Sequence, residues 1–71
     1  MNKEEILELI SKDINRCYRD FIYIKNNMKK EMAEGMRNRL DELLLLWHKI
    51  HSISFIDACK MFDINYKEIS K

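Results

Sequence analysis

The amino-acid sequence predicts an all-α fold. It consists of a helical hairpin over about residues 3–51 and two short helices over about 54–71, associated as a homodimeric bundle. Three observations lead to this prediction. The 71 residues include no proline and one glycine, so the chain lacks the turn residues that a many-stranded sheet needs at each reversal. Apolar residues recur at spacings of three and four. One segment is apolar on every side. A chain this short forms a single domain, and self-association is a common remedy for its small core.

The first helix is predicted from an apolar series whose members are spaced alternately by three and four positions. An average spacing of 3.5 residues holds one face of a helix against a partner helix over about three heptads. We therefore expect a long first helix packed along this series. Its members are Leu7, Ile10, Ile14, Cys17, Phe21, Ile24 and Met28.

A similar series predicts a second helix over about residues 36–51. Gly35, the only glycine, is placed where it could close the first helix in a left-handed conformation, whereas Asn26 and Asn27 offer another break. The alternative is one continuous rod of roughly 70 Å, stable only as an oligomeric coiled coil. We predict the hairpin, with Gly35 as the stronger break signal and the two asparagines as the weaker one. The second series comprises Met36, Leu40, Leu43, Trp47 and Ile50.

The second helix contains an apolar belt, residues 43–47 with the sequence LLLLW. One partner helix covers only one stripe of it, so Leu45 and Leu46 need further contacts. The C-terminal segment or a second copy of the chain must supply them. We therefore predict a homodimer and a protein target. Because large apolar and aromatic groups dominate interface energetics, the expected anchors are Leu45, Leu46, Trp47, Tyr18 and Tyr23.

The closing segment carries two helix-start signals. Ser54 followed by Asp57, and Asn65 followed by Glu68, each fit an N-cap with an acidic residue at the third helical position. Two short helices are expected, over about 55–62 and 66–71, with a turn at residues 63–64. The inward-facing residues would be Phe55, Ala58, Cys59, Phe62, Ile64 and Ile69.

Residues 54–71 resemble a truncated helix-turn-helix motif of DNA-binding regulators. The likeness rests on small residues at Ala58 and Cys59, a turn at Asp63, and apolar Phe62 and Ile64. In that family the second helix lies in the major groove of DNA. The resemblance implies contacts with bases or phosphates from Asn65, Tyr66, Lys67, Ser70 and Lys71.

A second resemblance covers residues 37–50, RNRLDELLLLWHKI. This stretch is similar to the second helix of the small sporulation-control aspartyl-phosphate phosphatases. Leu40 and Asp41 match the Leu-Asp pair of that family, but Arg37 and Asn38 replace its Ser-Gln pair. If the resemblance held, Asp41 would be the residue to carry over.

Signals of catalysis, cofactors and metals are weak. The chain has no glycine-rich phosphate loop and no nucleophile motif. His48 and His51 share a helix face and could join Cys59 around zinc, but no complete ligand set accompanies them. We therefore expect that the protein is not an enzyme and that it binds no cofactor and no metal.

The charge balance and the cysteines bear on partners and location. Thirteen basic residues oppose twelve acidic ones, so the chain has little non-specific attraction for nucleic acid. No apolar run approaches the roughly eighteen residues that span a bilayer, so we expect no membrane association. Cys17 and Cys59, with no leader pattern at the start, indicate a cytoplasmic protein with reduced thiols.

Together these observations predict a small regulatory protein that acts by stoichiometric protein binding. An inhibitor or an adaptor, of the kind that phages and mobile elements often encode, fits best. The alternative is a dimeric helix-turn-helix DNA-binding transcriptional regulator.

Overall fold

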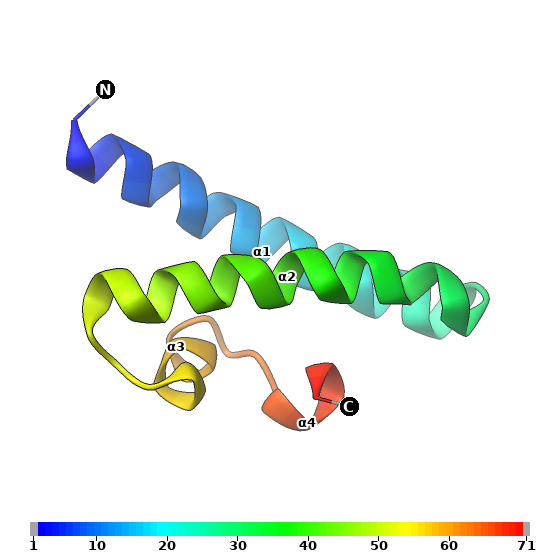
Figure 1. Cartoon of the computed structure of the whole chain (residues 1–71). Coiled ribbons are helices and arrows are strands. Elements are labelled where there is room, and N and C mark those ends of the chain that lie inside the picture. Colours follow the sequence, from blue (N-terminus) through cyan, green and yellow to red (C-terminus); the bar gives the residue numbers. More distant parts are fainter. Residues whose placement is uncertain (1, 71) are drawn as a thin grey trace.

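The computed structural model describes residues 2–70, and its regular structure is entirely helical. Two long antiparallel helices, α1 (Lys3–Asn27) and α2 (Lys30–His51), form the hairpin. Two short helices, α3 (Phe55–Met61) and α4 (Tyr66–Ile69), run back along one flank of α2 (Figure 1). The predicted all-α fold, with two long helices and two short C-terminal ones, is confirmed.

The hairpin turns at Met28 and Lys29, so the prediction of a break at Gly35 is wrong. Both turn residues have extended backbone conformations. The Asn27 side chain donates to the carbonyl of Tyr23, and the Met28 N–H donates to that of Ile24. These bonds satisfy carbonyls at the end of α1. The last carbonyls of any helix need such partners, because the helix itself supplies none. The asparagine signal therefore ends the first helix, and α2 begins six residues earlier than predicted.

Gly35 is an exposed interior residue of α2, and it has no conformational reason to be glycine. A Cβ added there would meet nothing within 4 Å, and its φ is not positive. Replacing Gly35 with alanine is therefore expected to stabilise the fold by about 0.5–1 kcal/mol. Urea unfolding measures this change, and a loss of stability in Gly35→Ala would contradict the position of Gly35 within α2.

The core lies where α1, α2 and the C-terminal helices meet. Ile14, Leu40 and Leu44 are completely buried, and Cys17 and Phe21 continue the series predicted for α1. The ends of that series are looser, since Met28 is 48% exposed at the turn. The centre of the predicted first seam is thus confirmed. The remaining buried apolar residues are Ala33, Trp47, Ala58, Cys59, Ile64 and Ile69.

The closing segment is held by the caps that the sequence predicted. The Ser54 side chain accepts from the Asp57 N–H at 3.0 Å, and the Asn65 side chain accepts from the Lys67 N–H at 3.0 Å. Asp63, between the two short helices, has a left-handed φ of 54°. Asp tolerates this conformation better than most residues do. Both helices end slightly before their predicted limits, and residue 71 lies outside the described residues.

Candidate functional site

A pocket of about 370 Å³ opens between α2 and the two short helices. We call it the α2–α4 pocket. The caps described above position its rims, because Ser54 starts α3 at Phe55 and Asn65 starts α4 at Tyr66. The rings of these two aromatic residues meet edge to face, with centroids 5.9 Å apart. Six residues make up most of its lining: Arg37, Asp41, Leu45, Phe55, Tyr66 and Ile69.

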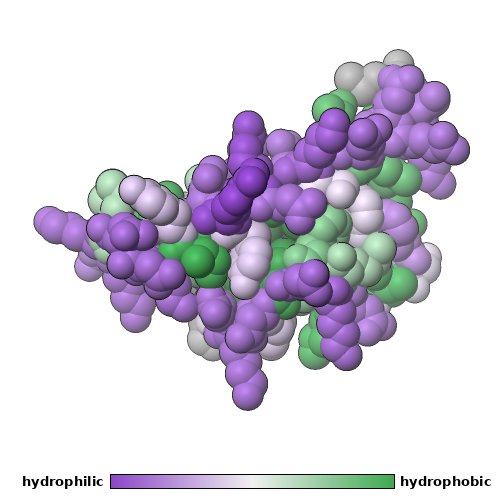
Figure 2. Space-filling model, turned by 180° about the vertical axis from the view of Figure 1, so that it is seen from behind, coloured by the Kyte–Doolittle hydropathy of each residue, from purple (hydrophilic) through white to green (hydrophobic). Residues whose placement is uncertain are grey.

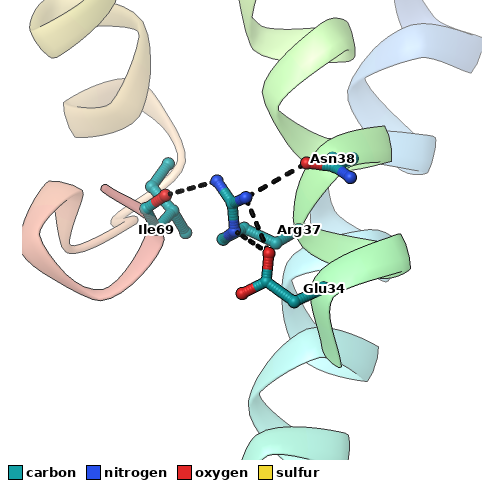
Figure 3. A network of polar contacts seen from close by, with 4 residues as sticks. All are labelled: Glu34, Arg37, Asn38 and Ile69. Carbon is teal, nitrogen blue, oxygen red and sulfur yellow. Dashed lines mark hydrogen bonds and ion pairs between the residues drawn. The ribbon is translucent and has the colours of Figure 1, made fainter. Parts of the chain in front are cut away.

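The floor of this pocket is a buried arginine whose donors are used inside the protein. Arg37 is 7% exposed, and its side chain extends from α2 toward α4 (Figure 3). Its Nη1 donates to the carbonyl of Ile69 at 3.4 Å. Its Nη2 donates to Glu34 at 2.8 Å and to the Asn38 side chain at 3.1 Å, and its Nε donates to Glu34 at 3.3 Å. Arg37 thus neutralises Glu34 and ties the end of the chain to α2.

Asp41 is the contrasting charge of the pocket. It stands one helical turn after Arg37, is half-buried, and forms no hydrogen bond or ion pair with another of the described residues. The Asp41 carboxylate also affects the protonation of a buried residue, Cys59. Burial first, and then the negative charge of Asp41, raise the pKa of the Cys59 thiol above its ordinary value. The carboxylate therefore faces the junction between α2 and α3 without a partner of its own.

The raised pKa of Cys59 predicts a loss of stability at alkaline pH. Because the folded state keeps the thiol proton to higher pH than the unfolded chain does, the stabilising contribution is fully present below the unfolded value near 9.0. It is lost as the pH rises from there through the folded pKa. Urea unfolding of the reduced protein at several pH values above this point should show a falling free energy of unfolding.

The matched control for this prediction is Cys59→Ala. Lysines and tyrosines that titrate in the same range are common to both chains, so only the thiol contribution differs. The alanine variant should lose stability less steeply with pH. If the free energy of unfolding fell equally steeply with pH in the two proteins, the raised pKa of Cys59 would be contradicted.

A second pocket, of about 310 Å³, lies on the other side of Arg37 near the hairpin turn. Lys25, Lys30 and Lys67 line it together with Glu34 and Glu68. Lys25 and Glu68 approach to 3.9 Å and join α1 to α4. With Arg37, four basic side chains line this pocket against two acidic ones, so its lining is net positive.

The opposite flank of the hairpin carries exposed apolar residues that no other element covers. Asp13 and Arg39 approach to 4.0 Å across the two long helices and mark this flank. Side chains four, seven or eleven residues away from them lie on nearly the same face of their helix, whereas Arg37 faces α4 on the other flank. We call these side chains the open face: Ile6, 44% exposed; Leu9, 49%; Leu46, 46%; and Ile50, 38%.

Seen from behind, apolar residues emerge between polar ones over the half of the molecule that holds α3 and the start of α1 (Figure 2). The start of α1 diverges from the end of α2 in the same region (Figure 1). The two long helices therefore leave apolar surface uncovered at the open end of the hairpin.

The five predicted protein anchors separate in the structure. Leu45, 40% exposed, lies at the rim of the α2–α4 pocket, and Leu46 belongs to the open face. Trp47 is 6% exposed and lies in the core, packed on His51 and Phe62, so it offers no surface for a partner. The Tyr18 hydroxyl accepts from the Asn65 N–H, and Tyr23 is 64% exposed.

The residues predicted for DNA contact lie on or beside α4. The Asn65 side chain caps that helix, Tyr66 lines the α2–α4 pocket, and Lys67 lines the second pocket. Ser70 borders both pockets, whereas Lys71 lies outside the described residues. These groups are exposed, but α4 itself has only four residues.

The histidines predicted as weak metal candidates bond to the backbone. His48 Nδ1 lies 2.9 Å from the carbonyl of Ile53, and His51 Nδ1 lies 3.0 Å from that of Trp47. Among residues 2–70, no group of three or more histidine, cysteine or acidic side chains is arranged to hold a metal ion.

Sequence reasoning noted Arg37 as a departure from the Ser-Gln pair and missed its role in holding the C-terminal segment. A signal was present, because Ala33, Arg37, Leu40 and Leu44 follow one another at spacings of four, three and four. That spacing puts Arg37 on the buried face of α2. Its partner Ile69, 32 residues away, could not be inferred from local pattern.

Comparison with other proteins adds no family to these observations. Neither protein-family models, nor curated proteins, nor solved structures gave a match to this chain. Within the described part of the chain, no helix combines the length and apolar character that crossing a membrane requires.

Proposed function

We propose that this chain is a small, non-enzymatic regulatory protein that binds other proteins stoichiometrically, as an inhibitor or adaptor, and that it does so as a homodimer. The observation that carries the proposal is the exposed apolar surface on both flanks of α2. Leu45 borders a formed pocket on one flank, and Leu46 belongs to the open face on the other. Contiguous exposed apolar surface rimmed by polar residues is typical of protein-binding sites.

The size of the surface supports this proposal. A folded monomer of 8.7 kDa is expected to expose about 4,700 Å². This chain exposes 5192 Å², about a tenth more. Its radius of gyration of 12.3 Å likewise exceeds the roughly 11 Å expected for a compact domain of this length. Such an excess of exposed surface is expected when part of that surface is covered only in a complex with another molecule.

The open face suits a second copy of the chain. A two-fold dimer needs one patch that is complementary to itself, and this face mixes apolar groups with the oppositely charged Asp13 and Arg39. The chain's net charge of +1 produces little repulsion between copies. Two hairpins joined by these faces would form a four-helix bundle with α3 and α4 on its outside. We place this protein in the cytoplasm, where Cys17 and Cys59, both buried and free, would stay reduced.

Capture from host cells followed by titration tests the binding of a target protein. A partner retained by the whole chain is purified and titrated calorimetrically, and the proposal expects one target per chain. Leu45→Ala should weaken binding at least about tenfold, because Leu45 lies at the pocket rim. Met32→Ala, which removes an exposed apolar side chain of α2 that lines neither of the two pockets, serves as the control. Equal binding by Leu45→Ala would exclude the pocket as the docking site.

The second candidate function is that of a helix-turn-helix DNA-binding regulator. It is favoured by the left-handed turn at Asp63 between two capped helices and by the exposed Tyr66 and Lys67. Binding to DNA of mixed sequence at low and at moderate salt tests it. A steep loss of affinity on adding salt would support this function, and no binding at either salt would remove it.

A further inference from the structure

The α2–α4 pocket combines aromatic and aliphatic walls with one free carboxylate. Phe55 and Tyr66 supply ring surface, and Leu45 and Ile69 supply aliphatic surface. Asp41 supplies the only acidic side chain among the lining residues. Its volume of about 370 Å³ is near the lower end for ligand pockets, which suits a single large side chain better than a cofactor.

The charge balance of this pocket favours a cation. Arg37 is the only basic residue in the lining, and its four hydrogen bonds to Glu34, Asn38 and Ile69 occupy four of its five N–H donors. Its charge is compensated by Glu34 at 2.8 Å. The Asp41 carboxylate has no such compensation among the described residues. An anionic occupant would approach an unpaired carboxylate, whereas a cationic occupant would supply the missing partner.

We propose that the α2–α4 pocket binds an arginine side chain presented by the target protein, with its guanidinium paired to Asp41 and its plane against the ring of Tyr66. This inference rests on the proposed function, because it names the chemistry of the partner. It assigns the pocket to a basic segment of a protein and not to nucleic acid.

Arginine fits this lining better than lysine does. A guanidinium is planar, pairs with a carboxylate through two parallel hydrogen bonds, and stacks on aromatic rings. It is also more weakly hydrated than an ammonium group, so it loses less on entering a half-buried site. The three methylene groups of an arginine would contact Leu45 at the rim, in the way that long basic side chains lay their stems on apolar surface.

The test uses capped single amino acids and the full-length, isotope-labelled protein. Arginine with both termini blocked is titrated into the protein while backbone amide resonances are followed by NMR. Saturable shifts are expected at the amides of Asp41, Leu45, Tyr66 and Ile69. Capped citrulline has nearly the same shape and no charge, and it should bind at least about tenfold more weakly, since it lacks the charge-assisted hydrogen bonds. Capped lysine should fall between the two.

Variants of the protein complete the test. Asp41→Asn should lose at least about tenfold in arginine binding. Glu42→Gln, which removes an acidic charge from the exposed neighbouring position outside the pocket, should bind as the wild type does. Tyr66→Leu keeps an apolar rim and removes the ring, so it should weaken arginine more than citrulline. Amide spectra of the free variants show whether each remains folded.

Several outcomes would overturn the inference. They are equal binding of arginine and citrulline, unchanged binding by a folded Asp41→Asn variant, shifts confined to other parts of the chain, and displacement of arginine by a DNA duplex that shifts the same amides. The proposed function fails separately. It fails if arginine binds as described but the chain retains no target protein. The inference alone fails if a target binds through Leu45 and no arginine of that target matters.

Discussion

Replacing Leu44 with alanine is expected to remove about 2–5 kcal/mol from the free energy of unfolding, the largest effect of any single substitution considered. Leu44 is completely buried, so truncation leaves a cavity in the core that the described residues form. A domain of this size has roughly 4–10 kcal/mol in total, so the variant should be close to unfolded at 37 °C. Urea unfolding at 25 °C measures the loss.

The neighbouring leucine is the control. Leu45 is 40% exposed at the rim of the pocket, so Leu45→Ala should cost about 1 kcal/mol or less in the absence of a partner. The same chemical change at adjacent positions thus separates a core residue from a surface residue. Equal losses for the two variants would mean that the orientation of α2 differs from the one described.

Replacing Arg37 with methionine is expected to cost about 1–3 kcal/mol, the range for hydrogen bonds that involve a charged group. Methionine keeps the apolar stem but loses the bond to the Ile69 carbonyl and the pairing with Glu34. A four-residue helix does not persist without tertiary contacts, so α4 should open before the rest of the fold. Hydrogen exchange should show this as faster exchange of the Ser70 amide, which donates to Tyr66 in the folded chain.

Arg19→Met is the matched control for this prediction. Arg19 is an exposed residue of α1 outside the open face, so its loss should change stability by less than about 0.5 kcal/mol. It should also leave the exchange of α4 unchanged. If Arg37→Met kept wild-type exchange in α4, the link between α2 and the end of the chain would be excluded.

The spacing of apolar residues was sufficient to predict the two long helices, because burial on one face imposes a helical period directly on the sequence. Ile14, Cys17 and Phe21 are buried as the first series required. The capping residues Ser54 and Asn65 were equally readable, since a cap acts within three residues of itself. Caps and helical periodicity both depend on residues close together in the sequence, so a short stretch of sequence is enough to predict them.

The position of the turn was harder to predict, because the glycine at position 35 and the asparagines at 26 and 27 both indicated a helix end. Glycine favours a helix end only where the backbone needs a left-handed residue, and the turn at Met28 and Lys29 is made with extended residues instead. The bonds made by Asn27 and Met28 end α1 without glycine. Gly35 then lies in an open part of α2, where it has no structural role.

The candidate site could be predicted only in part. The apolar belt correctly indicated that Leu45 and Leu46 would not both be covered by α1, and both remain substantially exposed. Which flank each one joins depends on the return of α3 and α4 along α2. That return depends on contacts between residues far apart in sequence, such as Arg37 with Ile69 and Tyr18 with Asn65. No short-range pattern specifies such contacts.

The apolar surface that this chain leaves uncovered is, in our account, a surface for contact with other proteins, beginning with a second copy of itself. Sedimentation equilibrium of the whole chain over a range of concentrations tests this most directly. We expect a mass twice that of the 8.7 kDa chain, and we expect Leu46→Glu to return it to the mass of one chain. A wild-type protein that keeps the mass of a single chain at the highest concentrations would contradict the account.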